Sequence, residues 1–309
     1  MRLRYMLAFA LLWPSIGLAG TGPWTLQARE HNVYLGTDYF RYGRFNGALP
    51  NVTLDTEIVS AGLTGVWTFG MAYGLEGEVV ARFEGVRVAD PRPALCNEGV
   101  PADWCDPTSG LGDVAARLKW QVVDEAYGFP LSWAFSVGTR TGEAYAPKRG
   151  RLTTLGDGST DVGGGVSLGR TGVLGRAGWY RFSTDAYYWY RFPSGQRNGQ
   201  KVPSDEVTGE IAMLLAPNPR FGFGPAVAGF TRIGGIDLNP PEADFGDPDF
   251  WNSLAATQLK VGGKLGVYSI DNGPTVSVSA LWTVYARNNP RDTFALSVGI
   301  GQWFAPRGD

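Results

Sequence analysis

The chain has 309 residues, of which 44 are glycine and 13% are aromatic, whereas only 18% are charged. A charged, solvated helical enzyme does not have this composition. A formal net charge of −2 gives no basic field for DNA or RNA, and one histidine with two cysteines is too few for the usual Cys/His zinc sites. We therefore expect no nucleic-acid partner, no metal and no cofactor.

The first residues have the pattern of a secretory signal peptide. Arg2 and Arg4 precede an apolar stretch over 5–13, and small residues at 17 and 19 place cleavage after Ala19. That stretch is too short for a membrane-spanning helix, and no later one offers about 18 uninterrupted apolar residues. Export without such a helix leaves soluble secretion or a β-barrel. We expect a signal peptide over 1–19 and then, over 20–31, a periplasmic N-terminal segment or a plug that folds back.

From residue 32 onward, apolar and polar residues alternate with a period of two. Val114, Leu118 and Trp120 point to one face of their segment, whereas Arg117 and Lys119 point to the other. Runs of this kind predict twelve strands, near 32–45, 54–69, 74–88, 111–123, 130–142, 161–170, 177–192, 205–215, 221–233, 253–269, 275–287 and 293–304.

The gaps between these segments alternate in length. Those at 46–53, 89–110, 143–160, 193–204 and 234–252 are mostly long, although 288–292 on the same side is short, and the intervening gaps are tight. Outer-membrane barrels combine short periplasmic turns with longer external loops, and a soluble sandwich has no reason to sort its loops in this way. We predict an all-β fold, a transmembrane antiparallel up-and-down β-barrel of about 12 strands over 32–304, with a periplasmic tail over 305–309.

The alternation also predicts which side chains face the barrel interior. A lipid-facing Arg or Lys near the membrane midplane costs about 2 to 4 kcal/mol, so charged residues within strands should point inward. The candidate lumen residues are Glu76, Glu78, Arg82, Glu84, Asp113, Arg117, Lys119, Arg140, Lys260 and Lys264. Aromatic residues on the apolar face near the tight turns form a candidate periplasmic girdle of Trp67, Trp120, Trp133, Tyr180 and Phe304, although a sandwich core could use the same residues.

Two loop features carry further expectations. Cys96 and Cys105 lie in a proline-rich stretch without a strand pattern, and in an oxidising compartment we expect them to form a disulfide within one external loop. Asp113, Asp157 and Asp161 lie in Gly/Asp turns near the predicted external rim. They could bind calcium or select solutes, but Asp and Gly that simply form turns are the simpler interpretation.

The C-terminal segment resembles the final strand by which outer-membrane proteins are recognised for insertion. Its alternating apolar residues over 294–304 close on Phe304, and five residues follow where many such proteins stop. The resemblance implies barrel-insertion machinery and outer-membrane lipid as partners.

A second resemblance rests on short motifs. Gly110-Leu-Gly-Asp113, the strand end Gly138-Thr-Arg-Thr-Gly142 and Leu155-Gly-Asp-Gly-Ser-Thr-Asp-Val162 are similar to the outer-membrane meta-pathway phenol-degradation family. That family usually reads Pro-Thr-Gly where this chain has Arg140-Thr141-Gly142. The resemblance implies a barrel that passes small, often aromatic or hydrophobic, compounds, and it assigns no binding residues.

Three functions are compatible with a barrel in the bacterial outer membrane. The first is a passive channel for a small-molecule solute. The second is a structural or adhesive barrel without transport. The third is a lipid hydrolase, which is disfavoured because His31 lies at the start of the first strand and not in a motif with a serine. We therefore do not expect an enzyme.

Overall fold

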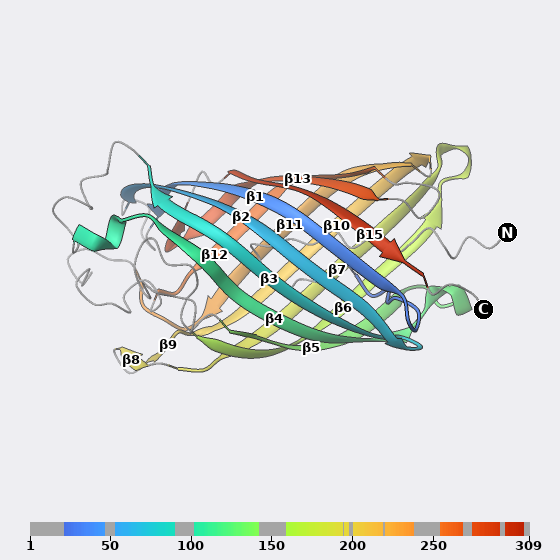
Figure 1. The fold of residues 1–309 in the computed structure, drawn as a ribbon, viewed down its shortest axis with the longest axis horizontal. Coiled ribbons are helices and arrows are strands. Elements are labelled where there is room, and N and C mark those ends of the chain that lie inside the picture. Colours follow the sequence, from blue (N-terminus) through green and yellow to red (C-terminus); the bar gives the residue numbers. More distant parts are fainter. Residues whose placement is uncertain are drawn as a thin grey trace.

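The computed structural model describes residues 22–46, 53–89, 102–141, 159–193, 195–197, 200–218, 220–237, 254–267, 274–290 and 294–305. Within these ranges, twelve long antiparallel strands form a closed barrel (Figure 1). Each strand pairs with its neighbours along the chain, and β1 closes the barrel by pairing with both β2 and β15. The barrel strands are β1 (His31–Asn46), β2 (Thr53–Ala72), β3 (Leu75–Val88), β4 (Thr108–Val123), β5 (Ser132–Thr141), β6 (Thr160–Val173), β7 (Trp179–Arg191), β10 (Asp205–Asn218), β11 (Phe221–Ile233), β12 (Thr257–Val267), β13 (Thr275–Arg287) and β15 (Phe294–Phe304).

The other described elements are short. β8 (Gly195–Arg197) and β9 (Gln200–Val202) form a hairpin, and β14 (Asn289–Pro290) pairs with the end of β1. Three single-turn 3-10 helices occur at η3 (Ala102–Cys105), η4 (Glu125–Tyr127) and η6 (Gly175–Ala177). None of the helices in the described ranges has the length and apolar character needed to cross a membrane.

The predicted fold class, a closed antiparallel barrel of twelve strands, is confirmed. β11 and β13 have the predicted bounds, but β4 begins at Thr108 where the pattern predicts 111, and β12 begins at Thr257 where it predicts 253. Leu254 forms an isolated bridge with Ile236 instead of extending β12. The β8–β9 hairpin lies in a segment predicted to be a loop, because strands of three residues are too short to show a period.

The two ends of the barrel differ. β1 begins and β15 ends at one end of the barrel, called here the termini end, where the short connections 73–74, 124–131 and 174–178 also lie (Figure 1, right). β1 ends and β2 begins at the opposite end, called the loop end, and the same holds for β3 and β4, β5 and β6, β7 and β10, β11 and β12, and β13 and β15. This arrangement follows from the up-and-down order, because alternate connections must lie at the same end.

The wall of the barrel has its polar side chains inside and its apolar side chains outside. On β4, Arg117 and Lys119 are 3% and 1% exposed, whereas their neighbours Leu118 and Trp120 are 44% and 57% exposed. The same alternation runs along β1, β3, β5, β7 and β10. A soluble protein buries its apolar residues, so this inverted pattern is typical of a barrel that faces lipid.

Glycines on the inner face of β6 make room for two aromatic rings. Tyr187 and Trp189 on β7 stack on each other with ring centroids 4.6 Å apart. A Cβ atom at Gly163 would lie 2.6 Å from the Trp189 ring, and one at Gly165 would lie 2.2 Å from the Tyr187 ring. These glycines therefore accommodate interior aromatic residues.

We expect Gly165→Val to destabilise the barrel by about 1 to 3 kcal/mol, because the added side chain would overlap the Tyr187 ring. Samples are heated to increasing temperatures before they are run on a detergent gel. The temperature at which the band of the folded barrel disappears measures the loss of stability. Gly65→Val is the matched control, since a Cβ atom at Gly65 meets no atom within 4 Å. An equal loss of stability in both variants would mean that strand propensity, and not the contact with Tyr187, causes the effect.

Candidate functional site: the barrel interior

The side chains of the candidate lumen residues point toward the interior of the barrel. Seven of them are buried, and Arg82, Asp113 and Arg140 are partly buried. Other inward charged residues were not singled out by the sequence pattern. These additional residues are Asp38, Arg181, Asp185, Arg191, Glu206, Glu210 and Arg232. The interior therefore holds many charges of both signs and is not a uniformly charged surface.

Near the termini end, the register of β3 and β4 places charges of opposite sign directly opposite each other. Glu76 pairs with Lys119 and Glu78 pairs with Arg117 in the strand register. The Glu76 Oε1 to Lys119 Nζ distance is 2.8 Å, and the Glu78 Oε1 to Arg117 Nη2 distance is 3.0 Å. Neighbouring side chains on one face of paired strands are close enough for such contacts.

The two ion pairs of Glu76 with Lys119 and of Glu78 with Arg117 are called here the charged ladder. The N-terminal segment over 22–30 contacts this ladder. The backbone N–H of Leu26 donates to Glu76 Oε2 at 2.8 Å, and Lys119 Nζ donates to the Gly22 carbonyl at 3.4 Å. Leu26 is itself 6% exposed. The segment predicted to be periplasmic or a plug therefore lies against inward-facing side chains at the termini end of the barrel.

A tryptophan fixes the same segment to β6 and β7. The Arg181 guanidinium on β7 lies 3.9 Å from the centroid of the Trp24 ring, and a Cβ atom at Gly169 on β6 would lie 2.5 Å from that ring. The Thr25 N–H and hydroxyl both donate to Gln121 Oε1 on β4, at 3.2 and 3.1 Å. Because these contacts come from β4, β6 and β7, the segment reaches across part of the lumen.

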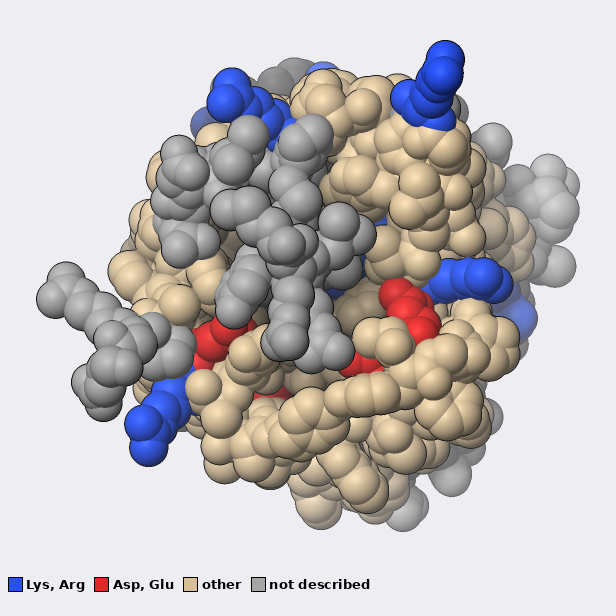
Figure 2. All heavy atoms as spheres, turned by 90° about the vertical axis from the view of Figure 1, so that its right-hand side faces the viewer, with Lys and Arg blue, Asp and Glu red and all other residues tan. Residues whose placement is uncertain are grey.

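Figure 2 shows the termini end of the molecule. Acidic side chains lie toward the middle of this face, and several basic side chains project around its edge. The visible acidic side chains of this face therefore lie nearer its middle than the basic ones do.

Halfway along the barrel, the ion pairs join different strands. Arg82 on β3 contacts Asp38 on β1 at 2.5 Å and Glu84 on its own strand at 3.0 Å. On the other side of the barrel, Lys264 on β12 pairs with Glu210 on β10. β2 lies between Asp38 and Arg82, and β11 lies between Glu210 and Lys264, so these two pairs link strands that are not adjacent.

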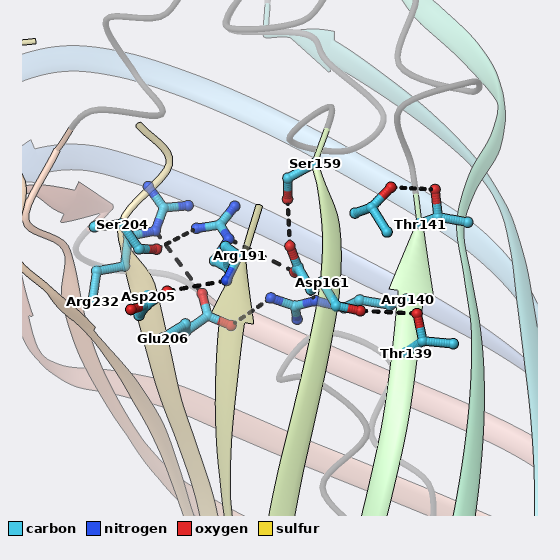
Figure 3. A network of polar contacts seen from close by, with 11 residues as sticks. Thr139, Arg140, Thr141, Ser159, Asp161, Arg191, Ser204, Asp205, Glu206 and Arg232 are labelled. Carbon is cyan, nitrogen blue, oxygen red and sulfur yellow. Dashed lines mark hydrogen bonds and ion pairs between the residues drawn. The ribbon is translucent and has the colours of Figure 1, made fainter. Parts of the chain in front are cut away.

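At the loop end, a network of charged side chains extends over five adjacent strands, β5, β6, β7, β10 and β11 (Figure 3). Arg140 contacts Asp161 at 2.5 Å and Glu206 at 3.1 Å. Arg191 lies 3.7 Å from Asp161, and Arg232 lies 3.9 Å from Glu206. Asp161, predicted at the external rim, is at the loop end of β6 with its side chain turned into the barrel.

One part of the interior is apolar. Buried residues of β1, β10, β11, β13 and β15 form a cluster of small and apolar side chains, and we call it the apolar wall. This cluster lies beside the inward charges that the same strands carry, such as Asp38 on β1 and Glu210 on β10. The apolar wall consists of Phe40, Ala212, Ala226, Ala228, Leu281 and Ala295.

The candidate girdle residues lie on the outer surface near the termini end. Trp67, Trp120, Trp133 and Phe304 are exposed, and Tyr180 is partly buried. His31 also lies at this end, where its ring stacks on Trp67 with centroids 6.0 Å apart. The apolar outer band thus carries large aromatic residues where the wall meets the short connections.

Three loop predictions can be placed only in part. Cys105 is disulfide-bonded and buried, whereas Cys96 and Asp157 lie outside the described residues, as do the predicted signal peptide over 1–19 and residues 306–309. Asp113 lies at a register shift between β3 and β4. Over the described ranges, no three His, Cys, Asp or Glu side chains are grouped so as to hold a metal ion.

The sequence matches no protein-family model and no curated protein. The fold, however, is similar to that of solved outer-membrane proteins. The COG4313 outer membrane channel from Pseudomonas putida F1 is 12% identical, covers 91% of this chain and 97% of its own, and has a TM-score of 0.67. The Ralstonia pickettii toluene transporter TbuX is 7% identical over 92% of each chain, with a TM-score of 0.40. At 12% identity, the likeness to the COG4313 channel establishes a shared barrel fold.

Proposed function

We propose that the chain forms a channel in the bacterial outer membrane for the passive passage of small solutes. The observation that carries this proposal is the inverted wall, with buried charged residues inside and exposed apolar residues outside. The similarity to an outer membrane channel over nearly the whole length of both chains supports it. The family resemblance of the short motifs adds aromatic or hydrophobic compounds as the expected solutes.

In this proposal the termini end faces the periplasm and the loop end faces outward, as is usual for outer-membrane barrels. The aromatic girdle would then lie at the periplasmic membrane interface. The inward charged residues would line the path, and the segment over 22–30 would narrow it on the periplasmic side through its contacts with Glu76 and Lys119.

A single-channel recording tests the proposal. The mature chain, reconstituted in a planar lipid bilayer, should produce discrete conductance steps, and it should fractionate with outer membranes in cells. Recovery of the folded chain from the soluble periplasm would contradict the membrane location. An inserted, folded barrel with no conductance and no uptake of small aromatic or hydrophobic solutes would contradict the channel.

A specific observation favours the second candidate, a structural or adhesive barrel. Ion pairs such as Lys264 with Glu210 and Arg117 with Glu78 are buried and extend over the interior. Side chains that fill a lumen stabilise a barrel without leaving a path. The same recording separates the two functions, because the structural barrel inserts without conducting.

A further inference from the structure

Two arginines lie on the outer wall of the barrel, among the side chains that face away from the interior. Arg41 on β1 and Arg87 on β3 are both exposed. In the strand register each lies directly opposite Val59 of β2, one on either side, so they share one level on three adjacent strands (Figure 1). Two strand spacings separate their Cα atoms by about 10 Å. We call these two residues the outer arginine pair.

The register also gives the height of this pair in the wall. Trp67 of the girdle faces outward on β2, eight residues from Val59 toward the termini end. Eight residues of a strand tilted by about 40° rise about 20 Å, close to the height of the apolar band of an outer-membrane barrel. With Trp67 at one lipid–water boundary, Arg41 and Arg87 lie near the other one, where an outward arginine costs little.

The outward side chains of β1, β2 and β3 between these two levels carry no charge. Next to the arginine pair, toward the termini end, the register places Tyr39, Ala61 and Gly85 in one row. A Cβ atom at Gly85 would meet no atom closer than 3.8 Å. Beyond this row of small residues, Leu63 and Phe83 are 45% and 56% exposed. An acyl chain can lie along this apolar stripe, and its headgroup then reaches the arginine pair.

The arginine pair carries more positive charge than its described surroundings offset. Glu57 on β2 contacts Arg41 Nε at 2.6 Å, and the Arg41 side chain remains 59% exposed. Among the outward side chains that the structure describes on β1 to β3, two guanidinium groups therefore accompany one carboxylate. Guanidinium groups bind phosphate well, because their planar N–H donors match the geometry of its oxygens. Charge and position together favour a phosphorylated lipid as the occupant.

We propose that the outer arginine pair binds the headgroup of a lipid with the chemistry of diphosphoryl lipid A, a disaccharide that carries two phosphates and several acyl chains. Arg41 and Arg87 lie on either side of β2, so each can contact one phosphate while the acyl chains pack along Leu63 and Phe83. This inference rests on the proposed function, in which the loop end faces outward. It adds a lipid site on the outer wall to the solute path inside the barrel.

Native mass spectrometry of the full mature chain in detergent, titrated with lipid, tests this site without relying on transport. Three probes divide the chemistry: diphosphoryl lipid A, monophosphoryl lipid A and dipalmitoyl phosphatidylglycerol. We expect diphosphoryl lipid A to bind at least about fivefold more tightly than either of the others, because its second phosphate contacts the second arginine. Equal or tighter binding of monophosphoryl lipid A or of phosphatidylglycerol overturns the proposal.

Two double variants locate the site. Arg41→Gln/Arg87→Gln removes both charges, so the affinity for diphosphoryl lipid A should fall about tenfold or more. The matched control is Arg176→Gln/Arg220→Gln, which removes two exposed arginines near the termini end and should leave this affinity within about twofold. Equal losses in both variants, or none in the first, overturn the assignment. If the first variant lacks the heat-sensitive folded band on gels, Arg87→Gln replaces it, with an expected loss of about threefold or more.

Glu57→Gln changes the site in the opposite direction. It removes the carboxylate that contacts Arg41 at 2.6 Å and that repels a nearby phosphate. We therefore expect diphosphoryl lipid A to bind about two- to fivefold more tightly to this variant. A weaker affinity in Glu57→Gln would contradict the role given to the arginine pair.

Recordings on the same preparations separate this proposal from the channel proposal. Conductance steps in a barrel that does not bind diphosphoryl lipid A would leave the channel and overturn the lipid site. Lipid binding that depends on the arginine pair, in a barrel that inserts but does not conduct, would leave the site and overturn the channel.

Discussion

Removing residues 22–27 from the mature chain should raise its single-channel conductance several-fold. The segment contacts Glu76, Lys119, Gln121 and Arg181, which project inward from three different strands. It therefore occupies part of the cross-section at the termini end, and its removal leaves the paired side chains of the wall in place. Planar-bilayer recordings of the shortened and complete chains measure the change.

The anchor of this segment offers a matched pair of substitutions. Trp24→Ala removes the ring that lies under the Arg181 guanidinium, whereas Trp24→Phe keeps an aromatic ring there. We expect Trp24→Ala to add transient openings to the larger conductance level and Trp24→Phe to behave as the unaltered chain. Identical conductance in the shortened and complete chains would show that the segment does not obstruct the path.

The strand pattern of the sequence predicts most of the barrel because one physical constraint acts on every strand. Each residue of a closed wall faces either lipid or the interior, so hydrophobicity alternates wherever the interior is polar. On β4 the alternation of Arg117 and Lys119 with Leu118 and Trp120 makes both the strand and its orientation readable. Strand ends are less well predicted, because β4 continues to Thr108 through residues whose pattern resembles a loop.

The interior is less predictable where both faces of a strand are apolar. On β10, Glu206 and Glu210 point inward, but farther along the same face Ala212 and Leu214 are buried in the interior. The alternation of polar and apolar residues ends at this point, so the sequence alone does not predict the apolar wall. The segment over 22–30 has no periodic pattern. The sequence therefore predicts only that it is a periplasmic segment or a plug, and it predicts none of the contacts.

Ion-pair partners require the strand register as well as the side-chain direction. The pair of Glu76 with Lys119 joins adjacent strands, and a correct register would predict it. Lys264 and Glu210 come from strands separated by β11, and their contact depends on the reach of both side chains across the wall. The sequence predicts which charged side chains point inward, but their pairing depends on the closed three-dimensional wall. Among the described residues, Lys260 is the inward lysine that has no carboxylate partner.

The second large effect concerns the stability of the buried ladder near the termini end. Glu78→Leu should lower the free energy of unfolding by about 3 to 5 kcal/mol, because it removes the carboxylate that lies 3.0 Å from the buried Arg117 guanidinium and puts nothing charged in its place. Urea-induced unfolding of the barrel in lipid vesicles measures this loss.

Adding Arg117→Met to Glu78→Leu should restore most of the lost stability, because two apolar side chains replace an ion pair whose desolvation was costly from the start. The difference between the single and double variants gives the coupling between the two side chains directly. A double variant as unstable as Glu78→Leu alone would mean that the ladder depends on the carboxylate for reasons other than its pairing with Arg117. Recovery of stability would instead show that the barrel tolerates an apolar interior at this ladder.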